Sequence, residues 1–416
     1  MISRLLPLLL AVGLASPLAA RGSLKGIPCS IDPLLNAPEC WKMTQSDFEK
    51  AFSQGPNQLY RWLTADKTRA KLVPNIFRNA HINLSAFDGK VPVQEVIVDF
   101  AEGKLNLVSI SFYNRGDNGR ISKELFKERY MTIGQAMGEQ LKLRPRQRTA
   151  RPSNGLLTEG YVWSSNQIAT ALLEHNAGAT TDGEQEFLRL RMARPHAKGM
   201  LAASLKHERG GAAVRLGQLP RNVVKGDKGD IYVANLPMVD QGDKGYCVAA
   251  TVQRLFEYYG IGADMHQIAE IAGSDPRRGT STLAMAKELD KIDYRFKTRL
   301  DILGMGKPMT EVDKKKGEYF IGDPYTEKDF IKAVHKYIDD GLPLLWSLQL
   351  GRYPEKPNLN PQTSGGHMRM IIGYNKETNE ILFSDSWGAG HELKRMQMGH
   401  AYKASHGLFV LKPTVR

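Results

Sequence analysis

A helix that begins at a cysteine places the strongest constraint on the fold of this chain. After Cys247, apolar residues recur with the spacing of one helix face, at Val248, Val252, Leu255 and Phe256. Cys247 therefore lies at the N-terminus of the expected helix. The unsatisfied backbone N–H groups and the positive end of the helix dipole favour a thiolate there. Because a thiolate is the nucleophilic form of cysteine, Cys247 is a candidate catalytic nucleophile.

Two later motifs and one earlier residue complete a catalytic set. His367 follows two glycines at the start of an apolar run, and Asp385 lies in Leu-Phe-Ser-Asp-Ser-Trp-Gly. We expect His367 to act as the base and then the acid, with Asp385 fixing its tautomer. Gln241, six residues before Cys247, carries an amide that can donate a hydrogen bond beside the sulfur.

On these motifs, residues 232–412 resemble the papain-like cysteine peptidases, most closely the bacterial branch that is similar to C39 peptidases. The resemblance implies a helical subdomain plus an antiparallel sheet, and hydrolysis of peptide or protein substrates. It also implies an oxyanion hole made by the Gln241 side chain and the Cys247 N–H, with Trp387 packed over the histidine and carboxylate. Asp385 stands where papain has asparagine, which makes the expected set Cys-His-Asp.

The length of 416 residues suggests two or three domains. We expect an α+β fold in which the papain-like domain follows a separate α+β domain. The predicted divisions are a signal peptide at 1–22, the amino-terminal domain at 23–196, a Gly/Lys/Arg-rich linker at 197–231 and the peptidase domain at 232–416. The amino-terminal domain shows no catalytic set. Its role is open between a cover over the cleft and a binding module.

The first residues resemble a secretory signal. Arg4 precedes an apolar run from Leu5 to Leu14, and small residues follow. The run is too short to span a bilayer, so we expect a secreted or periplasmic protein without a membrane span. Cys29 and Cys40 are then expected to form a disulfide, which leaves Cys247 as the reactive thiol.

Local patterns predict several elements of both domains. In the amino-terminal domain they are a capping box at 44–47, a hairpin at 96–112, a helix from Ser122 to Leu141, and strands near 160–164, 167–174 and 186–192. In the peptidase domain they are helices starting at Cys247, Asp264, Ser281 and Thr326, the last ending at Gly341, and an apolar strand at 343–350.

Composition favours neither a metal site nor a nucleic-acid surface. The histidine spacings match no common zinc pattern, and we expect no metal or cofactor. The net charge of +13 is spread over both halves, and no aromatic residue interleaves the basic run at 142–151, so we expect no nucleic-acid partner. Two alternatives to a peptidase stay open: a secreted binding protein with a peptidase-like fold, and a transglutaminase-like acyl transferase. The sequence does not indicate an oligomeric state.

Overall fold

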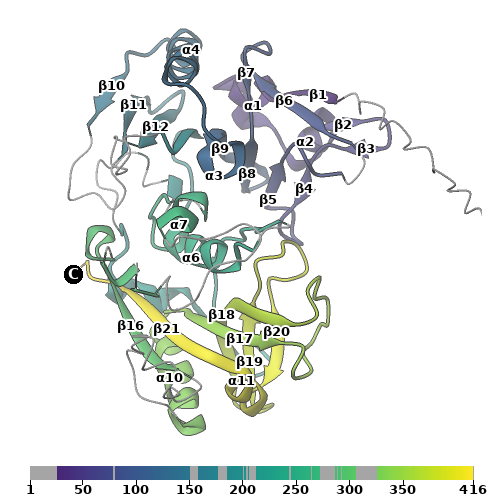
Figure 1. The fold of residues 1–416 in the computed structure, drawn as a ribbon, viewed down its shortest axis with the longest axis vertical. Helices are drawn as coiled ribbons and strands as arrows, with labels where there is room; N and C mark the ends of the chain where they lie inside the picture. The colour runs from purple at the N-terminus through teal and green to yellow at the C-terminus, as the bar shows by residue number, and fades with distance from the viewer. Residues whose placement is uncertain are drawn as a thin grey trace, which may run out of the picture.

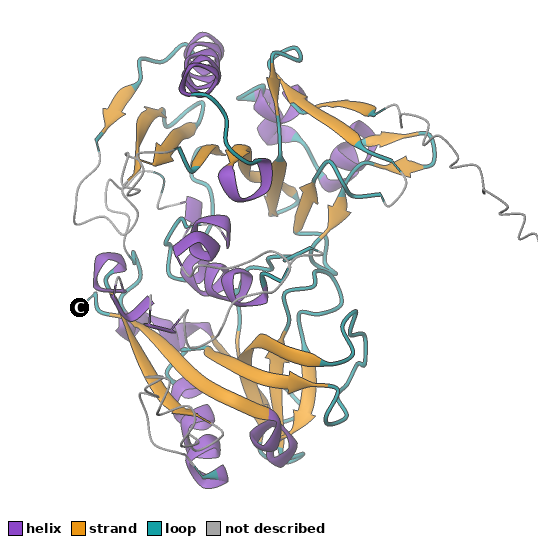
Figure 2. Cartoon of the chain, in the orientation of Figure 1, coloured by secondary structure: helices purple, strands orange, loops and turns teal. Residues whose placement is uncertain are grey.

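The computed structural model describes residues 26–77, 80–149, 158–176, 185–199, 201–202, 205, 212–242, 245–263, 265–271, 286–287, 289–291, 293–305 and 326–415. These residues form an amino-terminal α+β domain rich in strands and a carboxy-terminal domain that combines helices with an antiparallel sheet (Figure 2). The predicted signal peptide lies outside the described residues, as does most of the helix predicted to start at Ser281.

An eight-stranded antiparallel sheet forms the body of the amino-terminal domain. Its strands follow the order β10 (Arg146–Arg148), β11 (Thr158–Ser164), β12 (Thr170–Asn176), β13 (Phe187–Ala193), β9 (Lys104–Asn114), β8 (Glu95–Ala101), β5 (Arg69–Leu72) and β4 (Arg61–Trp62). The predicted hairpin is confirmed as β8 and β9, and the three later predicted strands are confirmed as β11, β12 and β13.

Smaller elements complete this domain. The short sheets consist of β1 (Ile27–Ser30), β6 (Ile82–Ala86) and β7 (Val91–Pro92), and of β2 (Ser53–Gln54) with β3 (Asn57–Gln58). The helices are α1 (Asp32–Leu35), η1 (Glu39–Lys42), α2 (Gln45–Ala51), α3 (Arg115–Asn118) and α4 (Lys123–Leu141). Both predicted helix starts are confirmed: Thr44 and Asp47 form a capping box on α2, and the Ser122 side chain caps α4.

The predicted disulfide between Cys29 and Cys40 is absent from the structure, where both thiols are free. Cys29 lies on β1 and Cys40 in η1, and both are buried in the apolar core of the amino-terminal domain. Burial raises the pKa of Cys29 to about 11 and that of Cys40 to about 12. Both are therefore neutral, unreactive thiols at ordinary pH.

The carboxy-terminal sheet is antiparallel throughout. Its main path is β14 (Val223–Lys225), β15 (Asp230–Val233), β18 (Gly365–Asn375), β17 (Leu344–Leu350), β21 (Ser405–Pro413) and β16 (Thr298–Met305), and β19 (Glu380–Ser384) joins β18 to β20 (Lys394–Gln397). The helices are η2 (Leu216–Asn222), α6 (Cys247–Tyr258), α7 (Met265–Ile271), η3 (Asp293–Phe296), α10 (Glu327–Asp339) and α11 (Met398–Ala404).

Several predictions for this domain are confirmed. Helix α6 begins at Cys247, and α10 carries the Thr326–Asp329 capping box and is followed by Gly341 in the left-handed region, at φ +73°. The predicted strand at 343–350 is β17. The second half of the predicted linker is structured instead of extended. Ala212 and Val214 join the core of this domain, and β14 and β15 extend its sheet.

Helix α6 lies between the two domains (Figure 1). One side of it packs on the carboxy-terminal sheet, while polar side chains on the other side face the sheet of the amino-terminal domain. Every residue of α6 after Cys247 is buried, including Gln253, Arg254 and Glu257. The polar face of this amphipathic helix is therefore covered by protein.

Candidate active site

Cys247 is the first residue of a twelve-residue helix, and its side chain is partly exposed. The first turn of α6 is tied to the strand that carries His367, because the Thr251 hydroxyl contacts the Cys247 carbonyl at 2.7 Å and the Met368 carbonyl at 3.3 Å. The helix start thus places the Cys247 sulfur beside the first residues of β18.

His367 and Asp385 form a buried pair. His367 lies near the start of β18, and its Nε2 donates to Asp385 Oδ1 at 2.6 Å. Asp385 follows the end of β19, the next strand of the sheet. The Trp387 ring stacks on the imidazole at 4.4 Å between centroids, with 16° between the planes. Only 3% of His367 is exposed. Asp385 holds one edge of its ring and Trp387 covers one face.

The three side chains shift one another's pKa values in a consistent direction. Burial opposes charge on the Cys247 thiol, but the neighbouring His367 outweighs it and lowers the pKa of the thiol from its ordinary value. Burial also opposes charge on His367, yet Asp385 and then Cys247 raise its pKa to about 9. Both shifts favour a thiolate beside an imidazolium over a neutral thiol and imidazole, and the two groups titrate as one coupled pair.

Asp385 is kept ionised by two cations that the sequence analysis did not identify. Arg369 Nε lies 2.8 Å from Asp385 Oδ2, and Lys394 Nζ lies 3.8 Å from the same oxygen. Burial raises the pKa of this carboxyl, but Arg369, His367 and Lys394 together lower it to about 2. Since one oxygen is occupied by the cations, the other is available to His367.

The same cations hold a loop in place. Arg369 donates to both carboxylate oxygens of Glu355, at 2.6 and 3.2 Å, and to Asn360 Oδ1 at 3.1 Å. Lys394 contacts the same two side chains. The loop between β17 and β18 is thereby anchored to the ion cluster beneath Asp385.

Gln241 lies next to this pair, connected through Ser386. The Gln241 backbone N–H donates to the Ser386 carbonyl at 2.9 Å, and the Ser386 hydroxyl donates to Gln241 Oε1 at 2.7 Å. Because Ser386 directly follows Asp385, this contact fixes the orientation of the amide relative to the Asp385 carboxylate.

Arg254, on α6, connects the three segments that supply the site. Its guanidinium donates to the Pro237 carbonyl at 2.7 Å, the Asp385 carbonyl at 2.8 Å and the Ser384 hydroxyl at 2.6 Å. It is 2% exposed. A single buried side chain thus links the Cys247 helix, the segment before Gln241 and the end of β19.

The structure brings all four predicted site residues into one region, and it adds Arg369, Lys394 and Arg254 as supporting groups. Arg369 could have been found from the sequence, because it lies two residues after His367 and alternate residues of a strand share a face. Lys394 and Arg254 gave no local signal. Within the described ranges, no group of three or more His, Cys, Asp or Glu side chains is placed to hold a metal ion.

The fold and these residues define a papain-like cysteine peptidase. Residues 233–408, within the carboxy-terminal domain, match the model of the Peptidase_C39 like family, and the protein is a cysteine-type peptidase.

A solved structure of xylellain, a cysteine protease from Xylella fastidiosa, is similar at a TM-score of 0.29 and 17% identity. The match covers 50% of this chain and 92% of xylellain. This similarity is too low to add to the family match. No curated protein sequence matches the chain.

Proposed function

We propose that this peptidase hydrolyses peptide bonds through Cys247, His367 and Asp385, with the Gln241 amide and the Cys247 N–H as the oxyanion hole. The observation that supports this most is the buried His367–Asp385 pair beside a partly exposed cysteine at a helix start. The family match supports the reaction class.

In the first half of the reaction, the Cys247 thiolate attacks the carbonyl carbon and the negative charge moves to the carbonyl oxygen. Donors placed in advance around that oxygen stabilise the charge. The imidazolium of His367 then gives its proton to the leaving amine as the C–N bond breaks, which leaves a thioester and a neutral imidazole.

In the second half, His367 takes a proton from water while the resulting hydroxide attacks the thioester carbonyl. The C–S bond breaks, the carboxylic acid leaves, and the thiolate–imidazolium pair is restored. Asp385 stays ionised throughout. It holds the Nε2–H tautomer and compensates the positive charge on the ring.

A proteome-derived peptide library, read by mass spectrometry, tests the proposal on many peptide sequences at once, so no single substrate has to be chosen. Wild-type protein is expected to cut a subset of peptides, and Cys247→Ala is expected to cut none of them. Equal cleavage by both proteins, or by neither, would refute the proposed nucleophile.

We also propose that the protein is exported, on the sequence of its first residues alone. Within the described residues, no helix is long and apolar enough to cross a membrane. Mass determination of the amino terminus of protein secreted by an expression host tests this proposal. An intact Met1 in that protein would contradict signal cleavage.

A further inference from the structure

The sheet of the amino-terminal domain turns a charged face toward the peptidase domain. On β5, Ala70 and Leu72 join the apolar core of their own domain, while Arg69 and Lys71 alternate with them and meet the other domain. On β13, Arg189 likewise reaches across, donating to the Gly262 carbonyl at 2.8 Å. The contact is therefore built from specific polar pairs.

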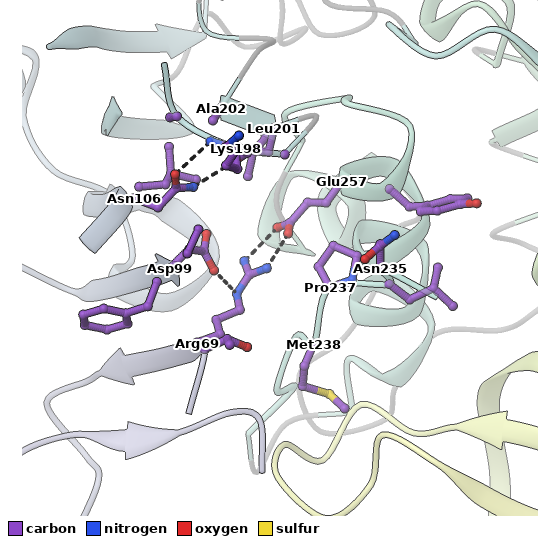
Figure 3. Close-up of a pocket in the computed structure, with 18 of the residues that line it drawn as sticks. Arg69, Asp99, Asn106, Lys198, Leu201, Ala202, Asn235, Pro237, Met238 and Glu257 are labelled. Atoms are coloured by element: carbon purple, nitrogen blue, oxygen red, sulfur yellow. Dashed lines mark hydrogen bonds and ion pairs between the residues drawn. The ribbon is translucent and has the colours of Figure 1, made fainter. Parts of the chain in front are cut away.

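Arg69 makes the central contact with the nucleophile helix. Its guanidinium donates to both carboxylate oxygens of Glu257 on α6, at 2.7 and 3.2 Å, and lies 3.4 Å from Asp99 of its own sheet. Figure 3 shows this arginine between the two carboxylates. Residues of both domains line the cavity beside it, which has a volume of about 880 Å³. Glu257 also accepts from Gln253 at 2.7 Å, so the contact extends along α6.

Lys71 makes a second contact, closer to the catalytic residues. Its Nζ lies 2.8 Å from Asp240 Oδ2, and the side chains are only 6% and 4% exposed. Asp240 Oδ1 accepts the Gly242 N–H at 2.9 Å. Arg61 Nη1 also lies 3.5 Å from Asp240 Oδ2, but its side chain is exposed. Lys71 is therefore the closer and the buried one of the two cations that hold this carboxylate, which closes the turn containing Gln241.

A buried lysine–aspartate pair contributes little net stability, because removing both charges from water costs nearly as much as their attraction returns. The pair has a larger effect on geometry than on stability, since both charges are satisfied only when the two segments lie in one relative position. Here the Lys71–Asp240 geometry fixes the position of the backbone directly before Gln241.

We propose that the amino-terminal domain is a positioning element of the peptidase site, in which Lys71 holds the Gln241 turn through Asp240 and Arg69 holds α6 through Glu257. This proposal rests on the proposed function of Gln241. It assigns the amino-terminal domain a role other than a cover or a separate binding module. Lys71 is a positioning residue that contacts no reacting atom.

The test compares full-length Lys71→Met with wild type on the library peptide that wild type cuts fastest. Loss of the anchor displaces an oxyanion donor, so kcat is expected to fall about 10-fold with KM within about twofold. The rate of Cys247 alkylation by iodoacetamide is expected to stay within about twofold, since the Cys247–His367 pair is untouched. Amide hydrogen exchange at Gln241 and Gly242 is expected to become faster.

Lys104→Met is the matched control, because Lys104 is an exposed lysine on β9 of the same sheet. It is expected to leave all three readouts unchanged. A Lys71→Met protein with wild-type kcat would overturn the proposal. So would an equal fall in kcat and in the alkylation rate, which would indicate general disruption of the site.

A second variant covers the case in which Lys71→Met alone does not fold. Lys71→Met combined with Asp240→Asn removes both buried charges of this pair and still breaks the ion pair that holds the Gln241 turn. Its kcat is expected to be similarly reduced, and a folded double variant with wild-type kcat would also overturn the proposal. Failure of the proposed function can be told apart from failure of this proposal. If the proposed function is wrong, the wild-type protein itself shows no Cys247-dependent cleavage.

Discussion

Replacing Arg369 by methionine removes the main cation beneath the catalytic carboxylate. Arg369 is fully buried and contacts Asp385 at 2.8 Å, Glu355 through two hydrogen bonds and Asn360 through one. The substitution leaves two buried carboxylates with Lys394 as the remaining cation of this cluster. Removing one partner of a buried ion pair costs about 3–5 kcal/mol, so the free energy of unfolding is expected to fall by about that amount.

Urea unfolding followed by fluorescence measures this change, with Arg352→Met as the matched control. Arg352 is exposed at the start of the loop that Arg369 anchors, and its replacement is expected to cost less than about 1 kcal/mol. The folded fraction of Arg369→Met is also expected to lose activity, because Asp385 loses its fixed orientation. A loss of stability below about 1 kcal/mol for Arg369→Met would refute the assigned role of the cluster.

Two further predictions concern the chemical step. Gln241→Ala is expected to lower kcat about 100-fold while leaving the alkylation rate of Cys247 within about twofold, because it removes only an oxyanion donor; equal losses in both would contradict that role. The kcat/KM of wild type is expected to fall as pH rises through about 9, where the raised pKa of His367 marks loss of the imidazolium. A profile still rising above pH 10 would contradict the assignment.

Local sequence signals predicted several helices of the peptidase domain, because the start of each helix is specified locally. The apolar periodicity after Cys247 predicted α6, and the Thr326–Asp329 pattern predicted α10. The structure of the predicted linker could not be predicted in this way, because it depends on a strand that is distant in the sequence. β15 forms because β18, a strand more than a hundred residues later, is available to pair with it, and β14 pairs in turn with β15.

The charged contacts between the domains could not be predicted for the same reason. Glu257 on a polar helix face normally indicates solvent, and no pattern near it points to Arg69, 188 residues away. Lys71 resembles any strand lysine until Asp240 is placed beside it. The disulfide prediction, made from compartment and spacing, did not account for the apolar core in which Cys29 and Cys40 are buried.

The pH dependence of Cys247 alkylation by iodoacetamide tests the central claim most directly. In folded wild-type protein, peptide mapping is expected to find the label on Cys247 alone, with its rate rising at a lower pH than for an ordinary cysteine, since His367 lowers the thiol pKa. In His367→Ala the rise is expected to move to higher pH, because the largest of the interactions that lower the thiol pKa is lost while burial remains. Labelling of Cys247 only after unfolding, or the same midpoint in both proteins, would contradict the account.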